Sequence, residues 1–192
     1  MVQTKYQKMI VITAPSGAGK TSITRHLMKV FPQLSFSISA ATRQPRSNEK
    51  NGVDYHFISV EDFQQKILNE EFVEWEMVYE GKYYGTLKSE LKRIWNSDEI
   101  PVLDIDVQGA IHVHKEYPVN SFFIFIKPPS IEELTKRLES RGSESKESLE
   151  TRINKAAYEL SFVNQFDNVI ENKDFATACA EAEKMVKTFL KK

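Results

Sequence analysis

The chain has 192 residues, of which 41% are hydrophobic and 28% are charged, and its formal net charge at pH 7 is -1; this composition is typical of one globular domain with a buried core. The near-neutral balance excludes an overall basic field that would hold nucleic acid non-specifically, so we expect an anionic partner to be a small molecule bound by a local cluster of cations. No stretch approaches the roughly 18 apolar residues of a membrane span, and the N-terminus has no signal-peptide pattern. We therefore expect a cytoplasmic protein without nucleic-acid or membrane partners. The sequence leaves open whether the protein forms a homodimer.

Apolar runs alternate with helix-like segments along the chain, which predicts an α/β fold with a layered core. The predicted strands span residues 9–13, 35–40, 100–106, 121–127 and 168–170. The predicted helices span residues 19–31, 130–141 and 146–164, followed by a C-terminal helix. The second of these begins at the Ser130 capping box and is ended by Gly142. The C-terminal helix carries Cys179 as a buried thiol. The near-continuous apolar strands favour a parallel sheet that is buried on both faces.

Residues 43–87 follow a different pattern, because aromatic and polar residues mix in DYHFISV and in FVEWEMVYEGKYYGT. We interpret this stretch as a small strand-rich insert with one short helix. The capping-type sequence from Ser59 to Asp62 marks the start of that helix.

The segment APSGAGKTS, residues 14–22, stands between a predicted buried strand and a predicted helix. From Ala14 to Thr21 it matches the phosphate-binding pattern G-x-x-x-x-G-K-[ST] at every fixed position except the first. Backbone N–H groups can converge on phosphates there, Lys20 can neutralise the β and γ oxygens, and the Thr21 hydroxyl can ligate Mg²⁺. The predicted ATP-phosphate contacts are Pro15, Ser16, Gly17, Ala18, Gly19, Lys20, Thr21 and Ser22.

Ala14 replaces the usual first glycine of this pattern, which matters only if the position needs a positive φ angle. Pro15 biases Ala14 toward extended dihedrals, which alanine adopts easily, so we expect the loop to form. The alternative is a glycine-rich turn that caps an ordinary helix.

A second group of phosphate-binding side chains follows in SISAATRQPRSNEKNGVDYHF, residues 37–57. Arg43 and Arg46 present planar guanidinium groups that suit a phosphate, and Tyr55 adds a hydroxyl donor. The alternative is an exposed arginine turn around Pro45.

The order and spacing of these segments resemble the guanylate kinase family, whose members transfer the γ-phosphoryl group of ATP to GMP. The resemblance covers nearly the whole chain, through APSGAGKTS, SISAATRQPR, NGVDYHF, FVEWE, YYGT, LDIDVQG, FIFIKPPS, KRLESRG and the helix of Arg152. It implies ATP and GMP as substrates, ADP and GDP as products, Mg²⁺ as cofactor and a place in purine nucleotide metabolism.

The resemblance also implies a P-loop nucleoside monophosphate kinase fold, formed by one unit at about residues 7–190. Its core comprises residues 1–42 and 88–192, with a helical lid at about 137–152, and residues 43–87 form the GMP-binding insert.

By the same resemblance, the GMP phosphate is held by Ser39, Arg43, Arg46, Tyr55 and Tyr84. Glu74 and Thr86 face the guanine, and Asp104 and Asp106 lie near GMP and the Mg²⁺ shell. Guanine carries adjacent N1–H and N2–H donors that one carboxylate can accept together, and Thr86 can donate to O6. The alternatives are a solvated strand carboxylate for Glu74 and a helix cap for Asp106.

The predicted catalytic residues are the cations Lys20, Arg43, Arg137, Arg141 and Arg152, since phosphoryl transfer requires charge stabilisation around the γ-phosphoryl group. Arg137 and Arg141 are four residues apart and share a helical face. The alternative for the lid arginines is pairing with Glu133 or Glu144 at the surface.

The chain departs from the family pattern at Ala14, at Ala41, where a second threonine is usual, and at Ser47-Asn48, where proline-glycine is common. One rival function is a kinase for another monophosphate, against which Glu74 and Thr86 argue. The other is a scaffolding module that binds phosphorylated peptides. Such modules typically lose the Lys and Ser/Thr of the phosphate loop, and this chain keeps both.

Overall fold

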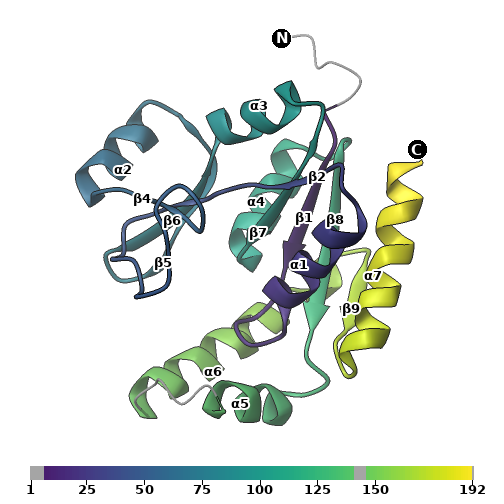
Figure 1. Ribbon diagram of the computed structural model, residues 1–192. Helices are drawn as coiled ribbons and strands as arrows, with labels where there is room; N and C mark the ends of the chain where they lie inside the picture. The colour runs from purple at the N-terminus through teal and green to yellow at the C-terminus, as the bar shows by residue number, and fades with distance from the viewer. Residues whose placement is uncertain (1–6, 141–145, 192) are drawn as a thin grey trace.

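The computed structural model describes residues 7–140 and 146–191 (Figure 1). Its centre is a parallel sheet with the strand order β2-β7-β1-β8-β9. These strands are β1 (Met9–Thr13), β2 (Leu34–Phe36), β7 (Ile100–Ile105), β8 (Ser121–Lys127) and β9 (Val169–Glu171). The predicted parallel α/β core is confirmed.

Helices cover both faces of this sheet, because alternate residues of each strand point to opposite sides. Ile10 and Ile12 belong to the core shared with α1 (Lys20–Val30) and α7 (Phe175–Leu190). Met9 and Val11 belong to the core shared with α3 (Lys88–Asn96) and α4 (Val107–Glu116). Cys179 is buried in the first of these cores, as predicted.

A second, smaller sheet has the strand order β4-β3-β6-β5 and lies to one side of the core (Figure 1). Its strands are β3 (Ala40–Ala41), β4 (His56–Phe57), β5 (Phe72–Tyr79) and β6 (Lys82–Leu87). Helix α2 (Val60–Leu68) packs on it through Phe63, whose ring stacks on Phe72 at 4.3 Å. The Ser59 cap is confirmed, since its side chain accepts a hydrogen bond from the Asp62 N–H.

The prediction of one strand at residues 35–40 is wrong. The segment forms two short strands in different sheets, β2 and β3. The Ser37 N–H still donates to Val102 O at 3.0 Å, but the Ile38 N–H donates to the Glu90 carboxylate at 3.1 Å. A side chain of α3 thus replaces a strand partner where the chain passes from one sheet to the other, just before the predicted insert at 43–87.

Two helices lie side by side beyond the end of the large sheet, α5 (Ile131–Glu139) and α6 (Lys146–Leu160) (Figure 1). The predicted Ser130 cap is confirmed by its hydrogen bond from the Glu133 N–H at 3.2 Å. The predicted helix to residue 164 is too long, because α6 ends at Leu160 and a 3-10 turn follows at Val163–Gln165. Arg141 and Gly142 lie outside the described residues.

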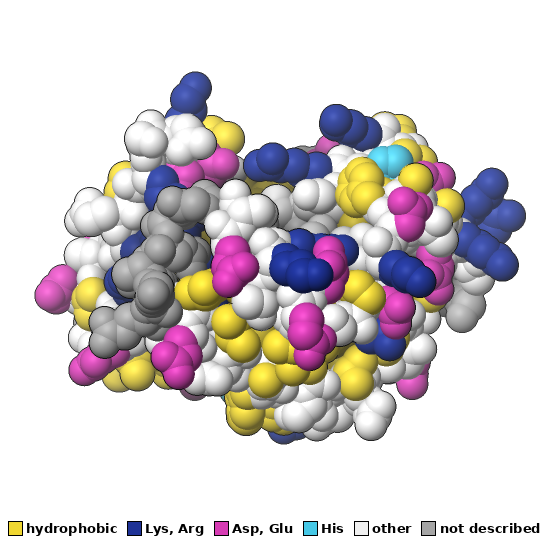
Figure 2. Space-filling model, turned by 90° about the horizontal axis from the view of Figure 1, so that it is seen from below, with side chains coloured by type: hydrophobic (Ala, Val, Ile, Leu, Met, Phe, Trp, Pro, Cys, Tyr) yellow, Lys and Arg dark blue, Asp and Glu magenta, His cyan; other side chains and the backbone are white. Residues whose placement is uncertain are grey.

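The surface seen from the side of α5 and α6 carries charged side chains of both signs, interspersed with apolar ones (Figure 2). This distribution agrees with the net charge of -1. Within the part of the chain that the structure describes, no helix has the length and apolarity needed to cross a membrane.

Candidate active site

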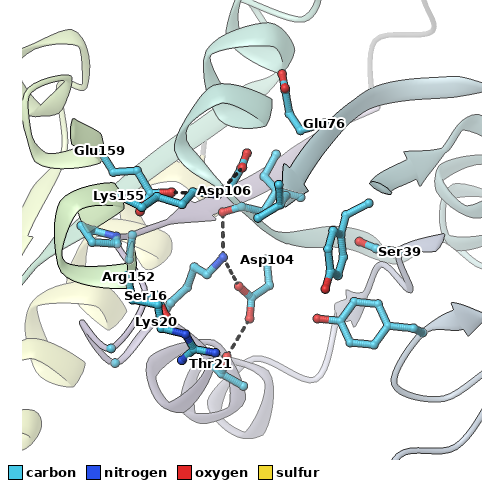
Figure 3. A pocket seen from close by; sticks show the side chains of 18 of the residues that line it. Ser16, Lys20, Thr21, Ser39, Glu76, Asp104, Asp106, Arg152, Lys155 and Glu159 are labelled. Atoms are coloured by element: carbon cyan, nitrogen blue, oxygen red, sulfur yellow. Dashed lines mark hydrogen bonds and ion pairs between the residues drawn. The ribbon is translucent and has the colours of Figure 1, made fainter. Parts of the chain in front are cut away.

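A cavity of about 730 Å³ opens where the carboxyl ends of β1 and β7 meet the second sheet and α6 (Figure 3). Ligands of open α/β sheets gather at the carboxyl ends of the strands, and roughly 300–1,000 Å³ is usual for a small-molecule site. The lining residues come from the loop after β1, the start of α1, the end of β7, the second sheet and α6. One cavity therefore joins segments that are far apart in the sequence.

The loop between β1 and α1 forms one wall of the cavity. Gly17 and Gly19 have φ angles of +92° and +97°, which glycine adopts without the penalty of a Cβ atom. Among the described residues, the non-glycine residues with positive φ are Glu70 and Asp98, so Ala14 is not strained by its side chain. The predicted ATP-phosphate residues that line the cavity are Pro15, Ser16, Gly17, Gly19, Lys20, Thr21 and Ser22, whereas Ala18 is buried behind them.

Lys20 and Thr21 are both held by Asp104 at the end of β7 (Figure 3). The Lys20 ammonium lies 2.7 Å from Asp104 Oδ1 and donates to Ile105 O at 2.7 Å. The Thr21 hydroxyl donates to Asp104 Oδ2 at 3.1 Å. Burial by itself would lower the pKa of Lys20, but the Asp104 carboxylate outweighs it and raises that pKa above its usual value. Lys20 is therefore a fixed positive charge in the cavity.

The oxygens of Thr21 and Asp104 fit a magnesium ion. A hydroxyl and a carboxylate oxygen lie 3.1 Å apart beside the phosphate loop. Mg²⁺ takes oxygen ligands, and in phosphate sites one or two protein oxygens suffice because phosphate and water complete the shell. The predicted Mg²⁺ ligand Thr21 thus has a carboxylate oxygen of Asp104 beside it, and its role as a ligand stays a prediction.

Glu74 reaches the cavity from β5 and is buried, with 6% of its surface exposed. Its Oε1 accepts a hydrogen bond from the Thr86 hydroxyl of β6 at 2.6 Å. Oε2 lies against Gly109 of α4, where an added Cβ would come within 2.6 Å of it. Burial raises the pKa of Glu74 to about 7. The solvated carboxylate that the sequence left open is therefore excluded.

The predicted phosphate receivers Ser39, Arg46, Tyr55 and Tyr84 all line the cavity. Arg43 lies behind them and contacts two of them: its Nε donates to the Tyr84 hydroxyl at 3.1 Å, and its guanidinium stands 4.9 Å from the centre of the Tyr55 ring.

A paired contact with Glu49 fixes the Arg43 guanidinium, through Nη1 to Oε2 and through Nη2 to Oε1 at 2.7 Å. The hydrogen bonds from Arg43 lower the pKa of Glu49 to about 2. Glu49 therefore stays ionised at neutral pH and holds Arg43 next to the receiving side chains.

The other predicted site residues differ in their positions. Asp106 lines the cavity and also caps α4, since its Oδ1 accepts from the Gly109 N–H at 2.9 Å; this is the cap that the sequence offered as an alternative. Arg152 lines the cavity from α6 (Figure 3). Arg137 instead contacts Glu133, at 3.4 Å, and Asn172 O, at 3.0 Å. The catalytic roles of all the cations predicted for the transfer stay predictions: Lys20, Arg43, Arg137, Arg141 and Arg152.

Sequence reasoning missed several polar residues that line the cavity. Glu76 follows Glu74 by two positions on β5 and so lies on the same face, a period that the sequence displays. Lys155 and Glu159 follow Arg152 by three and seven positions on α6, which is helical spacing for one face. Lys155 lies 3.6 Å from Asp106 and 3.7 Å from Glu159. Burial raises the pKa of Glu159 to about 7.

Known proteins match this chain over nearly its full length. The family model described as guanylate kinase matches residues 6–189. Guanylate kinase of Bacteroides fragilis is 46% identical, in an alignment that covers 95% of this chain and 90% of that protein. Guanylate kinase of Porphyromonas gingivalis is 44% identical, in an alignment that covers 96% of this chain and 99% of that protein. The crystal structure of guanylate kinase from Anaplasma phagocytophilum aligns with a TM-score of 0.76 at 29% identity, over 94% of this chain and 85% of its own.

These matches confirm the predicted fold, a parallel-sheet core of the P-loop nucleoside monophosphate kinase type. The chain belongs to the guanylate kinase family.

Proposed function

We propose that this protein is an ATP:GMP phosphotransferase that converts ATP and GMP to ADP and GDP in purine nucleotide metabolism. The observation that carries the proposal is that the phosphate loop and the buried Glu74 open to one cavity, together with Arg46, Tyr55 and Tyr84. A donor phosphate and an acceptor nucleotide can therefore lie in the same cavity, as direct transfer between them requires.

On the donor side, the loop that follows Pro15 offers backbone N–H groups at the N-terminus of α1, where the helix dipole favours anions. Lys20 supplies a fixed positive charge at the β and γ oxygens, and its orientation is set by Asp104. Thr21 and Asp104 would hold Mg²⁺. The chemistry that a bound Mg²⁺ would supply there is positive charge, which would offset part of the negative charge of the phosphates.

On the acceptor side, Ser39, Arg46, Tyr55 and Tyr84 offer donors for the GMP phosphate, with Arg43 supporting them from behind. The Glu74 carboxylate would accept from guanine N1–H and N2–H. Adenine has no such donor pair, so a buried Glu74 left without donors would disfavour AMP. Thr86, which donates to Glu74 at 2.6 Å, fixes the orientation of that carboxylate.

In the transfer itself, a phosphate oxygen of GMP forms a bond to the γ-phosphorus of ATP, and the bond from that phosphorus to the β–γ bridging oxygen breaks, releasing ADP. Lys20 and Arg152, which line the cavity, would stabilise the charge on the transferring group, and Arg137 and Arg141 would join them from the lid at about 137–152. The division into a core, residues 1–42 and 88–192, and a GMP-binding insert, residues 43–87, belongs to the same proposal, as does a cytoplasmic location.

A coupled assay with ATP as donor and GMP, AMP, UMP or CMP as acceptor tests the proposal. We expect turnover with GMP, and removal of Mg²⁺ by a chelator should abolish it. Equal turnover of AMP and GMP would overturn the assignment of the acceptor.

The affinity for GMP should increase as the pH rises through about 7. Burial raises the pKa of Glu74 to about 7, so its carboxyl group is mostly protonated at pH 6 and mostly ionised at pH 8. Only the ionised form accepts from both guanine donors without opposing them with its own proton. The KM for GMP should therefore fall between pH 6 and pH 8.

The control for this pH dependence is Glu74→Gln, which has no titrating group at this position but keeps every other ionisable group, including the GMP phosphate. The difference between the two pH profiles isolates Glu74. Parallel profiles in the two proteins would contradict the role of Glu74 in binding guanine.

A further inference from the structure

Asn172, directly after β9, joins the phosphate loop to the other end of the chain. It is buried, with 5% of its surface exposed, and its side-chain Nδ2 donates to Ala18 O at 2.8 Å. The reverse orientation of the amide would set two oxygens against each other, so the side chain must donate here. Neither the sequence motifs nor the cavity lining includes this residue.

Two backbone contacts hold Asn172 in place. Its N–H donates to Lys127 O at 2.9 Å, which continues the pairing of β8 and β9 beyond the last residue of β9. Its O accepts from Arg137 Nη2 at 3.0 Å. The side-chain amide therefore extends from a fixed backbone to the loop.

The hydrogen bond to Ala18 O determines which way the peptide between Ala18 and Gly19 faces. A trans peptide is planar, and its C=O and N–H groups point in opposite directions. Ala18 is fully buried, whereas Gly19 lines the cavity. With the Ala18 carbonyl directed inward to Asn172, the Gly19 N–H is directed outward, to the cavity wall where phosphates are expected.

The glycine at position 19 fits this arrangement. Its φ angle is +97°, and an added Cβ would come within 2.3 Å of Asn172 Nδ2. The amide of Asn172 therefore occupies the space that a side chain at position 19 would need.

We infer that Asn172 is a positioning residue for phosphoryl transfer, which holds the Ala18–Gly19 peptide so that the Gly19 N–H donates to a phosphate of the donor nucleotide. The inference rests on the proposed function in taking this loop as the ATP-phosphate site. Asn172 should therefore affect binding of the triphosphate group of ATP and not binding of the adenine base.

The test compares Asn172→Leu with a matched control. Leu has nearly the same volume but no donor, so the peptide loses its fixed orientation. Asn168→Leu is the control, because Asn168 stands just before β9 and its Nδ2 donates to a backbone carbonyl, Phe123 O, at 2.9 Å. Inorganic tripolyphosphate is the probe, since it carries the phosphates without a base, and its binding is measured by calorimetry on the full chain.

Asn172→Leu should weaken tripolyphosphate and ATP by about the same factor, on the order of tenfold, as the loss of one phosphate hydrogen bond implies. Asn168→Leu should bind both as the unaltered protein does, and the affinity of Asn172→Leu for GMP should be retained. Weakening of ATP alone would point to a contact with the base and would overturn the inference. Equal losses in the two variants would reduce Asn172 to a general folding role and would overturn it too.

A measurement on the unaltered protein keeps the inference testable if Asn172→Leu does not fold. The amide proton resonance of Gly19 should move downfield when tripolyphosphate is added, because it gains a charged acceptor. A Gly19 resonance that does not respond to bound tripolyphosphate would refute the inference. A protein that binds tripolyphosphate in this way but leaves GMP unphosphorylated would instead refute the proposed function and support the inference about Asn172.

Discussion

Lys20→Ala should lower kcat by roughly 10²-fold or more, because it removes a pre-positioned charge from the transferring phosphoryl group. The structure adds a reason for a large effect. Asp104 Oδ1 and Ile105 O each lie 2.7 Å from the Lys20 ammonium, so the charge that the substitution removes is one held in a fixed position beside the phosphate loop.

Steady-state measurements of kcat at saturating ATP, GMP and Mg²⁺ would check this result, with the melting temperature recorded to separate lost catalysis from lost folding. Lys29→Ala is the control, because Lys29 lies in the last turn of the same helix and is exposed. It should retain the turnover of the unaltered protein. Near-normal turnover of Lys20→Ala would contradict the assignment of the phosphate loop.

Glu74→Gln should weaken GMP far more than ATP. The Thr86 hydroxyl donates to Oε1, so the glutamine keeps its carbonyl oxygen there and presents its NH₂ group at the position of Oε2. That group faces a guanine donor with another donor. Leaving a buried donor unpaired costs about 1 to 3 kcal/mol, which corresponds to roughly a 5- to 150-fold increase in the KM for GMP.

Steady-state KM values for both substrates would measure this effect. Glu71→Gln is the matched control, because Glu71 directly precedes β5 and its carboxylate pairs with Lys66 at 2.8 Å, away from the cavity lining. It should leave both KM values unchanged. If Glu74→Gln weakened ATP and GMP by equal factors, Glu74 would have a folding role instead of a role in guanine recognition.

The cavity also shows how nearby carboxyl groups differ in their titration. Burial raises the pKa of both Glu74 and Glu159 to about 7, whereas the Arg43 guanidinium holds the pKa of Glu49 near 2. The hydrogen-bonded Arg43 guanidinium keeps Glu49 ionised, whereas burial dominates at Glu74, and at Glu159 it outweighs Lys155 at 3.7 Å, so these two carboxyl groups become sensitive to pH near neutrality. The pH dependence of GMP binding should therefore come from Glu74 and not from the Arg43 pair.

The sequence by itself determined the features that local patterns encode. Apolar runs of strand length predicted the parallel core, and the caps at Ser59 and Ser130 were visible because capping depends on residues three positions apart. The phosphate loop was recognisable because its glycines, Lys20 and Thr21 serve backbone geometry and phosphate chemistry within one short segment.

Only the tertiary structure decided which distant residues meet. The alternation at residues 35–40 suits a strand in either sheet, so the sequence could not show that the chain leaves β7 at Ser37 and joins the second sheet at Ala40. Likewise, a helical pattern does not define which face of a helix points to a ligand. Lys155 and Glu159 line the cavity only because α6 packs beside it, whereas Arg137 of α5 does not line the cavity.

Asn172 is the clearest case, since it lies 154 residues from Ala18, the partner of its side chain. Such contacts follow from the packing of β9 beside β8 and near the loop after β1, and no local sequence signal records them. A motif specifies which groups can bind phosphate. The fold specifies how those groups are held, because the orientation of a single peptide depends on side chains that the chain brings together only when it is folded.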